Sequence, residues 1–241
     1  MLRFYFVIIN SIIFIIYYIV KLRIMSANKR HCSIESRYRT VRHLAIHCMI
    51  NSNIRTSVFG KENLPKEGGY VMYPNHQGRY DIVGIFYAHK KPCTLVMEAE
   101  RSKIPIATEV IEALDGVRLD KTNMRSQVSA ISRITNEVSD GRRYVIFPEG
   151  GYDNNKNELQ EFKPGAFKVP LKTKCPIVPV VLVDSYKPYT INTIRRVRTQ
   201  VHFLEPIFYD EYKGMSTHEL SDLVKSRIQA KMNSVLSSRE K

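Results

Sequence analysis

Two segments at the start of the chain have apolar patterns that predict helices. Residues 4–20 contain only two polar side chains, Asn10 and Ser11, and a helix of this length reaches roughly 26 Å, just short of a hydrocarbon core about 30 Å thick. A cleaved signal peptide has a shorter apolar stretch followed by small residues, whereas residues 21–25 read KLRIM. We therefore predict an uncleaved membrane anchor that spans the bilayer or is partly embedded in it.

Basic residues directly follow the predicted anchor. Seven of them lie between residues 21 and 42, with Glu35 as the one acid, and the cytoplasmic flanks of membrane segments carry such an excess. We therefore expect the rest of the chain on the cytoplasmic face. Residues 38–54 place apolar side chains at helical spacing, which suits either an interfacial amphipathic helix or a helix packed on the domain that follows.

From about residue 59, short apolar runs alternate with helical stretches. The runs predict strands at residues 70–73, 94–97, 116–119, 143–147, 177–183 and 199–203. Helices are predicted at residues 82–89, 104–114, 125–139 and 165–172, and a last helix begins at a capping box of Ser216 and Glu219. This order indicates an α/β fold with a largely parallel sheet flanked by helices. We divide the chain into residues 1–58, the membrane anchor and basic amphipathic helical segment, and residues 59–241, the α/β domain.

The composition adds two constraints. Of the 241 residues, 44% are hydrophobic, so the chain can bury a core and is not a disordered protein. Its 37 Lys and Arg residues against 23 Asp and Glu residues give a net charge of +14, which indicates an anionic partner such as a phosphorylated small molecule, a lipid head group or nucleic acid. The four cysteines form no C-x-x-C pair and suit buried thiols, not a zinc site or a disulfide framework.

The first candidate for chemistry follows the strand predicted at residues 70–73. His76 and Asp81 lie five positions apart, and a loop through Gly78 would let Asp81, at the start of the next helix, accept a hydrogen bond from the imidazole. That bond would fix the tautomer and leave the other ring nitrogen free to take a proton from a hydroxyl. Alone, the pattern also fits a helix cap at Asp81 and a turn residue at His76.

Two further strand ends carry polar residues, and ligands of open α/β sheets bind at the carboxyl ends of strands. Glu149, Gly150 and Gly151 offer a carboxylate and exposed backbone N–H groups that could bind a hydroxyl and a phosphate. Arg118 and Lys121 are placed to meet an anion. Taken singly, the first set also fits an ordinary Gly-Gly turn, and the second fits a solvated charge pair.

The order and spacing of the three sets resemble the glycerolipid acyltransferase family, whose best-known members acylate lysophosphatidic acid. His76 and Asp81 match its H-x-x-x-x-D pair, residues 147–150 match its F-P-E-G block, and residues 116–121 resemble its glycine-to-Asp-Arg block. Residues 177–180 match its late V-P-V strand. The resemblance runs from about residue 59 to residue 205. It implies a glycerol-3-phosphate acyltransferase-like fold, with residues 59–241 as the acyltransferase domain.

The resemblance also implies a mechanism of direct acyl transfer. His76, oriented by Asp81, would deprotonate the free hydroxyl of 1-acylglycerol-3-phosphate, which attacks an acyl thioester and gives phosphatidic acid. Backbone N–H groups near Asn75–Gly78 would stabilise the oxyanion, and Glu149 would accept a hydrogen bond from the glycerol part. We expect no metal and no cofactor, since acyl-CoA or acyl-carrier protein serves as the donor substrate. The sequence contains no G-x-S-x-G, P-loop or G-x-G-x-x-G motif.

The sequence departs from the family pattern in four places, which together cover five positions. The departures are Gly151-Tyr152 in place of Thr-Arg, Lys121 in place of Arg, Arg118 in place of an aromatic or apolar residue, and Glu98 in place of Lys. We expect Arg118, Lys121 and the backbone of residues 150–151 to hold the phosphate. The pair of Arg101 and Lys103 is a further source of positive charge.

Other functions fit part of the sequence. A sibling acyltransferase would use glycerol-3-phosphate or another lysophospholipid, and a non-catalytic peripheral membrane protein would need none of His76, Asp81 and Glu149. Residues 163–201 carry eight basic side chains and one acid, Asp184, which would suit nucleic acid or an acidic acyl carrier protein. Since no nucleic-acid motif accompanies them, we expect lysophosphatidic acid, the acyl donor and membrane lipid as partners, and no nucleic acid.

Overall fold

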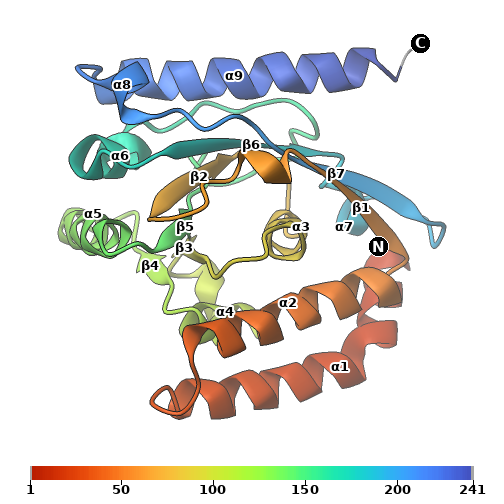
Figure 1. The fold of residues 1–241 in the computed structure, drawn as a ribbon. Helices are drawn as coiled ribbons and strands as arrows, with labels where there is room; N and C mark the ends of the chain where they lie inside the picture. The colour runs from red at the N-terminus through yellow and green to blue at the C-terminus, as the bar shows by residue number, and fades with distance from the viewer. Residues whose placement is uncertain (1, 240–241) are drawn as a thin grey trace.

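The computed structural model describes residues 2–239, and their side chains from residue 5 onward. Seven strands form one sheet in the order β1-β7-β6-β2-β5-β3-β4 (Figure 1). The strands are β1 (Ile54–Phe59), β2 (Tyr70–Pro74), β3 (Thr94–Glu98), β4 (Val117–Leu119), β5 (Arg143–Val145), β6 (Ile177–Val183) and β7 (Val197–Phe203). Neighbouring strands are parallel except for β6 and β7, which are antiparallel. The predicted α/β class with a largely parallel sheet is confirmed.

Helices cover both faces of the sheet (Figure 1). One face packs against α2 (Ile34–Asn51), α3 (Asp81–Ala88) and α4 (Ala107–Ala113), and α1 (Leu2–Ala27) lies outside α2. The other face packs against α5 (Met124–Ser139), α6 (Lys168–Thr173) and α9 (Thr217–Ser237). The short helices are η1 (Lys61–Asn63), η2 (Arg101–Lys103), η3 (Pro164–Phe167), α7 (Lys187–Thr190) and α8 (Tyr209–Tyr212). The result is a three-layer fold with a core on each side of the sheet.

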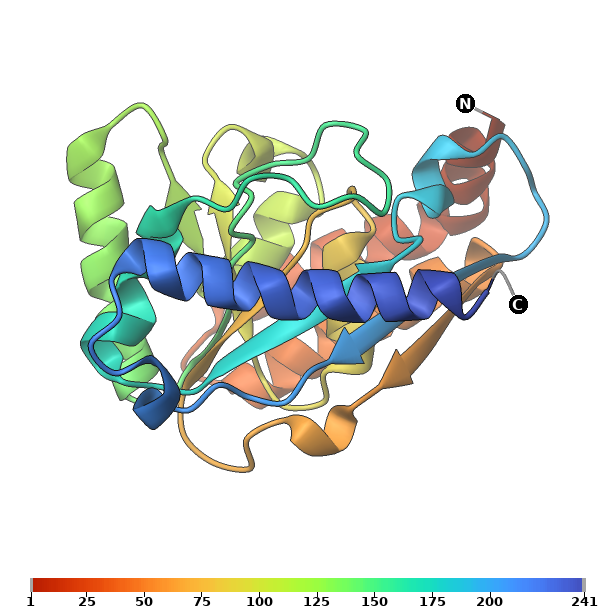
Figure 2. The same ribbon diagram turned by 90° about the horizontal axis from the view of Figure 1, so that it is seen from above.

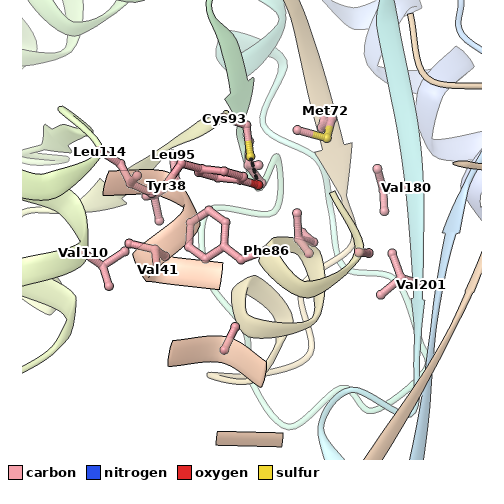
Figure 3. Packing of buried hydrophobic residues seen from close by; sticks show 14 of the residues in the cluster. Tyr38, Val41, Met72, Phe86, Cys93, Leu95, Val110, Leu114, Val180 and Val201 are labelled. Carbon is pink, nitrogen blue, oxygen red and sulfur yellow. Dashed lines mark hydrogen bonds between the residues drawn. The ribbon is translucent and has the colours of Figure 1, made fainter. Parts of the chain in front are cut away.

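Strand β6 shows why its sequence, IVPVVLV, is apolar throughout. Val178 and Val180 point into the core that α2 and α3 cover, whereas Val181 and Val183 point into the core under α9. A strand covered on both faces has no solvent side and therefore no polar alternation. In the first core, Figure 3 shows Tyr38 of α2 beside Phe86 of α3, with the Tyr38 hydroxyl in contact with Cys93.

Each predicted strand is present within two residues at either end, and residues 177–183 match β6 at both ends. Two predicted helices differ from the observed ones. Residues 104–114 become helical only at Ala107, because Pro105 and Ile106 (φ 71°) precede the first turn. Residues 165–172 divide between η3 and α6.

Strand β1 was not predicted: the helix expected at residues 38–54 ends where the strand begins, and the α/β domain was expected to start only at residue 59. Helix α2 ends at Asn51, and the chain then runs as β1 along the edge of the sheet, parallel to β7. The domain boundary expected between residues 58 and 59 falls within this strand. The division into an anchor and an acyltransferase domain stays a prediction.

The first two helices form a hairpin on the domain. Of the two roles left open for residues 38–54, α2 takes the second: Tyr38, Val41 and Leu44 are buried in the core of the domain. Arg23 of α1 pairs with buried Glu109 at 2.7 Å, and Arg37 of α2 pairs with Asp115 at 2.9 Å. Charged contacts as well as apolar ones therefore hold the hairpin against α4.

Helix α1 has one buried side and one exposed apolar side. Tyr18 and Leu22 face the domain, whereas Ile9 and Ile13 are 71% and 78% exposed. From Tyr5 to Ala27 the helix is long and apolar enough to cross a membrane, by length and composition. An exposed apolar side of this size suits contact with a lipid phase.

Candidate active site

The three polar sets that the sequence singles out follow β2, β5 and β4. Strands β2, β5, β3 and β4 are parallel neighbours, so the loops after them lie along one edge of the sheet (Figure 2). This is the edge at which α/β sheets bind ligands.

His76 and Asp81 meet as expected. The loop after β2 folds back, and His76 Nδ1 lies 2.7 Å from Oδ2 of Asp81, the first residue of α3. The same oxygen accepts hydrogen bonds from the backbone N–H groups of Gln77 at 2.6 Å and Gly78 at 2.9 Å. A carboxylate oxygen can only accept, so the proton of this pair lies on Nδ1 and Nε2 keeps its lone pair. Nε2 is therefore the nitrogen that can take a proton.

Two aromatic rings hold the imidazole in place. The ring of Phe147 stacks on His76 with 4.1 Å between centroids, and Tyr152 approaches it edge-on at 4.7 Å. The guanidinium of Arg101 lies over the ring of Tyr152, 4.9 Å from its centroid. Sequence reasoning treated Tyr152 only as a departure from a motif, and no spacing signal indicated that it would contact the histidine.

Glu149 is buried and contacts the backbone of His76. Its Oε1 accepts the backbone N–H of His76 at 3.1 Å, and its Oε2 accepts Nε2 of Gln160 at 3.1 Å. Burial raises the pKa of Glu149 to about 8, and the nearby Asp81 carboxylate adds to the shift, although the two hydrogen bonds oppose it. The carboxyl group is therefore largely protonated at neutral pH. Gly150, at φ 71°, follows Glu149 and closes a turn in which its N–H donates to the carbonyl of Phe147 at 3.1 Å.

The loop that carries His76 is held on its other side by a set of amide side chains. Gln77 donates to Asn157 Oδ1 at 3.0 Å and accepts the backbone N–H of Ser185 at 2.8 Å. Asn157 in turn donates to Asp184 at 2.9 Å, and Asn155 donates to the carbonyl of His76 at 3.2 Å. The segment after Tyr152 therefore holds the chain at the carbonyl of His76 and at the side chain of Gln77, a role that no motif indicated.

Asn75 and the backbone N–H groups that follow it, which we expected to contact the substrate, have partners within the protein. The side chain of Asn75 bonds both ways to the backbone of Leu182, so it ties the end of β2 to β6, and it is fully buried. The backbone N–H groups of His76, Gln77 and Gly78 each donate to a carboxylate of Glu149 or Asp81. In this arrangement those three groups already have protein partners, and their expected role in stabilising an oxyanion stays a prediction.

The two basic residues predicted to bind phosphate, Arg118 and Lys121, lie at different places in the structure. Lys121 donates to the carbonyl of Gly150 at 2.6 Å and pairs with Glu98 at 2.9 Å, so it lies beside the Glu149 loop. Arg118 instead donates to Ser102 at 3.1 Å and to Glu112 of α4 at 3.0 Å. Arg101, which belongs to the further pair of Arg101 and Lys103 named beside Arg118 and Lys121, lies over the ring of Tyr152.

The basic residues between positions 163 and 201 do not form one continuous surface. Of the eight basic residues between 163 and 201, half lie on or beside η3 and α6, and the others lie at α7 and β7; Figure 1 shows α6 and α7 at opposite ends of the fold. Among residues 2–239, no group of three His, Cys, Asp or Glu side chains is arranged to hold a metal ion.

Comparisons with known proteins agree on one family. Residues 55–183 match the family model named Acyltransferase, a range that contains His76, Asp81 and Glu149. A protein of Borreliella burgdorferi named 1-acyl-sn-glycerol-3-phosphate acyltransferase is 25% identical over 189 residues, which are 76% of this chain and 74% of that protein. Its Bos taurus relative, 1-acyl-sn-glycerol-3-phosphate acyltransferase alpha, is 26% identical over 191 residues, which cover 78% of this chain and 66% of that protein.

The fold has a counterpart among solved structures. The crystal structure of the 1-acyl-sn-glycerophosphate (LPA) acyltransferase PlsC from Thermotoga maritima superposes with a TM-score of 0.79 at 20% sequence identity. The match covers 97% of this chain and 95% of that one, so it includes the N-terminal hairpin as well as the sheet. The expected fold type is confirmed.

Proposed function

This chain belongs to the acyltransferase family, and we propose that it transfers a fatty acyl group from an acyl thioester to the free hydroxyl of 1-acylglycerol-3-phosphate, giving phosphatidic acid. The names of the relatives support this acceptor. The observation that carries the proposal is the His76–Asp81 pair at 2.7 Å, at the ligand edge of the sheet and inside the family match. The pair leaves one imidazole nitrogen able to act as a base.

The proposed reaction needs no acyl-enzyme. His76 Nε2 takes the proton of the acceptor hydroxyl as its oxygen attacks the thioester carbonyl. The tetrahedral intermediate then collapses, the C–S bond breaks, and the imidazolium returns the proton to the departing thiolate. Asp81 holds the ring orientation and stabilises the imidazolium through Nδ1. The stacked Phe147 keeps the ring from turning.

Glu149 and its loop would line the acceptor side of the site. Glu149 supports the backbone of His76, and as a neutral acid it can still donate a hydrogen bond to the glycerol part of the acceptor. Lys121, held at the carbonyl of Gly150, supplies positive charge there, and Gly151 leaves room beside it. Arg118 would contribute only at longer range, since it is engaged with Ser102 and Glu112.

The acceptor is a membrane lipid, which gives α1 a role. We propose that the exposed apolar side of α1 contacts the bilayer, with the basic residues that follow it on the cytoplasmic face. The hairpin packs on α3 and α4, and we propose that the catalytic edge faces the lipid phase. Either acyl-CoA or acyl-carrier protein can serve as the thioester donor in this scheme.

The test is an assay of the purified full-length protein in detergent micelles. Radiolabelled lysophosphatidic acid, glycerol-3-phosphate and lysophosphatidylcholine are each offered with acyl-CoA and with acyl-carrier protein. We expect turnover with lysophosphatidic acid to exceed that with the other two acceptors. Preference for glycerol-3-phosphate or for lysophosphatidylcholine would support the sibling acyltransferase instead, and no turnover with any pair would support a non-catalytic membrane protein.

A further inference from the structure

Glu98 lies between two cations at the edge of the candidate site. It is the last residue of β3, and its Oε2 pairs both with Lys121 Nζ at 2.9 Å and with Arg101 Nε at 3.3 Å. One carboxylate oxygen thus satisfies two positive side chains that come from different segments, η2 and the loop after β4.

Both cations are connected to the reacting centre. Arg101 lies over the ring of Tyr152, whose edge contacts His76, and Lys121 is bonded to Gly150, next to Glu149. A phosphate held by Arg101 and Lys121 would therefore lie beside Tyr152, which contacts His76, and beside Gly150, which follows Glu149. Arg101 follows β3, whereas Gly150 and Tyr152 follow β5, and these two segments lie side by side in Figure 2.

The three side chains are exposed enough to exchange partners. Glu98 is 30% exposed, Lys121 43% and Arg101 49%, and ion pairs in such positions are weak because water screens them. A phosphate monoester carries close to two negative charges and three acceptor oxygens, whereas Glu98 carries one charge. The monoester can therefore replace Glu98 on both cations.

We propose that Arg101 and Lys121 bind a phosphate monoester and that Glu98 is a built-in competitor for the same two cations. This rests on the proposed function for the source of the phosphate, the head group of the acceptor. Glu98 neutralises part of the site when it is empty and returns to the cations when the ligand leaves. It lowers affinity for the acceptor and for the phosphatidic acid product alike, which keeps the product from occupying the site.

A competitor of this kind affects binding and not chemistry. Removing its charge strengthens binding of the ground state and the transition state equally, so KM falls while kcat stays the same or becomes limited by slower product release. The alternative role for Glu98, holding Arg101 and Lys121 in position, predicts the opposite: removal would weaken binding. The two roles therefore predict opposite changes in the affinity for phosphate when the charge of Glu98 is removed.

The test compares Glu98→Gln with Glu100→Gln, a matched control whose exposed carboxylate pairs with Lys103. Calorimetry of the full-length protein with inorganic phosphate and with methyl phosphate measures binding without acyl transfer. We expect Glu98→Gln to lower both dissociation constants about two- to tenfold, with no change in Glu100→Gln. The KM for lysophosphatidic acid should fall by a similar factor, and in a Lys121→Ala background the effect of Glu98→Gln should shrink.

Each other outcome decides a part of the proposal. Weaker or unchanged phosphate binding in Glu98→Gln would overturn it and assign Glu98 a positioning role or none. Tighter phosphate binding with an unchanged KM for lysophosphatidic acid would assign the site to free phosphate and overturn the role in acceptor binding. Tighter phosphate binding in a protein that acylates no acceptor would support the site and contradict the proposed function.

Discussion

Asp81 and Glu98 both lie beside cationic or proton-donating groups of the same site, yet they are held in different ways. Asp81 is fully buried, and one of its oxygens accepts two backbone N–H groups besides the imidazole. Glu98 is partly exposed and contacts two flexible side chains. The inner half of the site, His76, Asp81 and Glu149, is thus tied to backbone, whereas the outer half, Glu98, Arg101 and Lys121, is tied mainly to itself.

The difference assigns different kinetic roles to the two halves. Groups fixed to the backbone keep their geometry before the substrate arrives, so they can orient and stabilise charge at no further cost in the transition state. Side chains that exchange partners in water cannot hold a geometry as closely, but they can adapt to a ligand. Changes in the inner half should therefore lower kcat, and changes in the outer half should act on KM.

The largest effect is expected from His76→Ala. Loss of the proposed general base should lower kcat about 10²–10⁴-fold, because proton removal from the acceptor hydroxyl is then left to water. The fold should survive, since the imidazole is near the surface and its backbone bonds remain. Steady-state assays would compare it with His218→Ala, on the exposed side of α9. Near-normal turnover in His76→Ala would refute the mechanism.

Asp81→Asn should have the next largest effect. The amide keeps the size of the carboxylate but removes the charge that steadies the imidazolium, and a hydrogen bond to a charged group contributes about 1.5–3 kcal/mol. We therefore expect kcat to fall roughly 10- to 100-fold, with KM little changed. A rise in KM without a loss of kcat would contradict the assignment of Asp81 to the inner half.

Glu149→Gln should have a smaller effect on turnover and a clear effect on stability. The pKa of Glu149 is raised from its usual value near 4.5 to about 8 in the folded state, so the folded protein retains a proton that the unfolded chain releases. The wild type should therefore lose stability as pH rises from about 4.5 to 8, by at most about 1.4 kcal/mol per pH unit. Gln resembles the neutral acid and does not titrate, so the variant should lack this loss.

Urea unfolding at several pH values between 4.5 and 9 measures the difference between the two proteins. The free energy of unfolding of Glu149→Gln should gain on that of the wild type as pH rises, whereas exposed Glu205→Gln should follow the wild type. If Glu149→Gln instead became relatively less stable toward high pH, the carboxyl group would be ionised in the folded protein, and its role as a neutral donor would be wrong.

Much of the fold could be predicted from local pattern. Apolar runs with turn residues between them located six strands, and the capping box at Ser216 located α9. Strand β1 was missed because its six residues alternate only briefly and are stabilised by pairing with β7, more than a hundred residues away. The motif residues His76 and Asp81 were found for the same local reason: five positions separate them.

The outer half of the site could not be predicted in this way. Arg101, Tyr152 and Lys121 come together through the parallel pairing of β5, β3 and β4, and the direction of each exposed side chain depends on partners distant in sequence. Arg118 illustrates the point. It precedes Lys121 by three positions and has the same charge, but the strand turns it toward Ser102 and Glu112.

The smallest effect is therefore expected from Arg118→Ala, and it tests the boundary of the outer half directly. Arg118 is half exposed on edge strand β4, and its guanidinium pairs with Glu112 on α4, so its removal costs little stability and leaves Lys121 in place. We expect KM for lysophosphatidic acid to change less than about twofold, whereas Lys121→Ala should raise it several-fold, because one charge of a phosphate contact is lost. Parallel KM measurements at low and moderate salt separate the two, since only Lys121→Ala should weaken the dependence of KM on ionic strength. An equal rise in KM for Arg118→Ala and Lys121→Ala would mean that Arg118 leaves Glu112 to bind the ligand. The outer half of the site would then include Arg118 on β4.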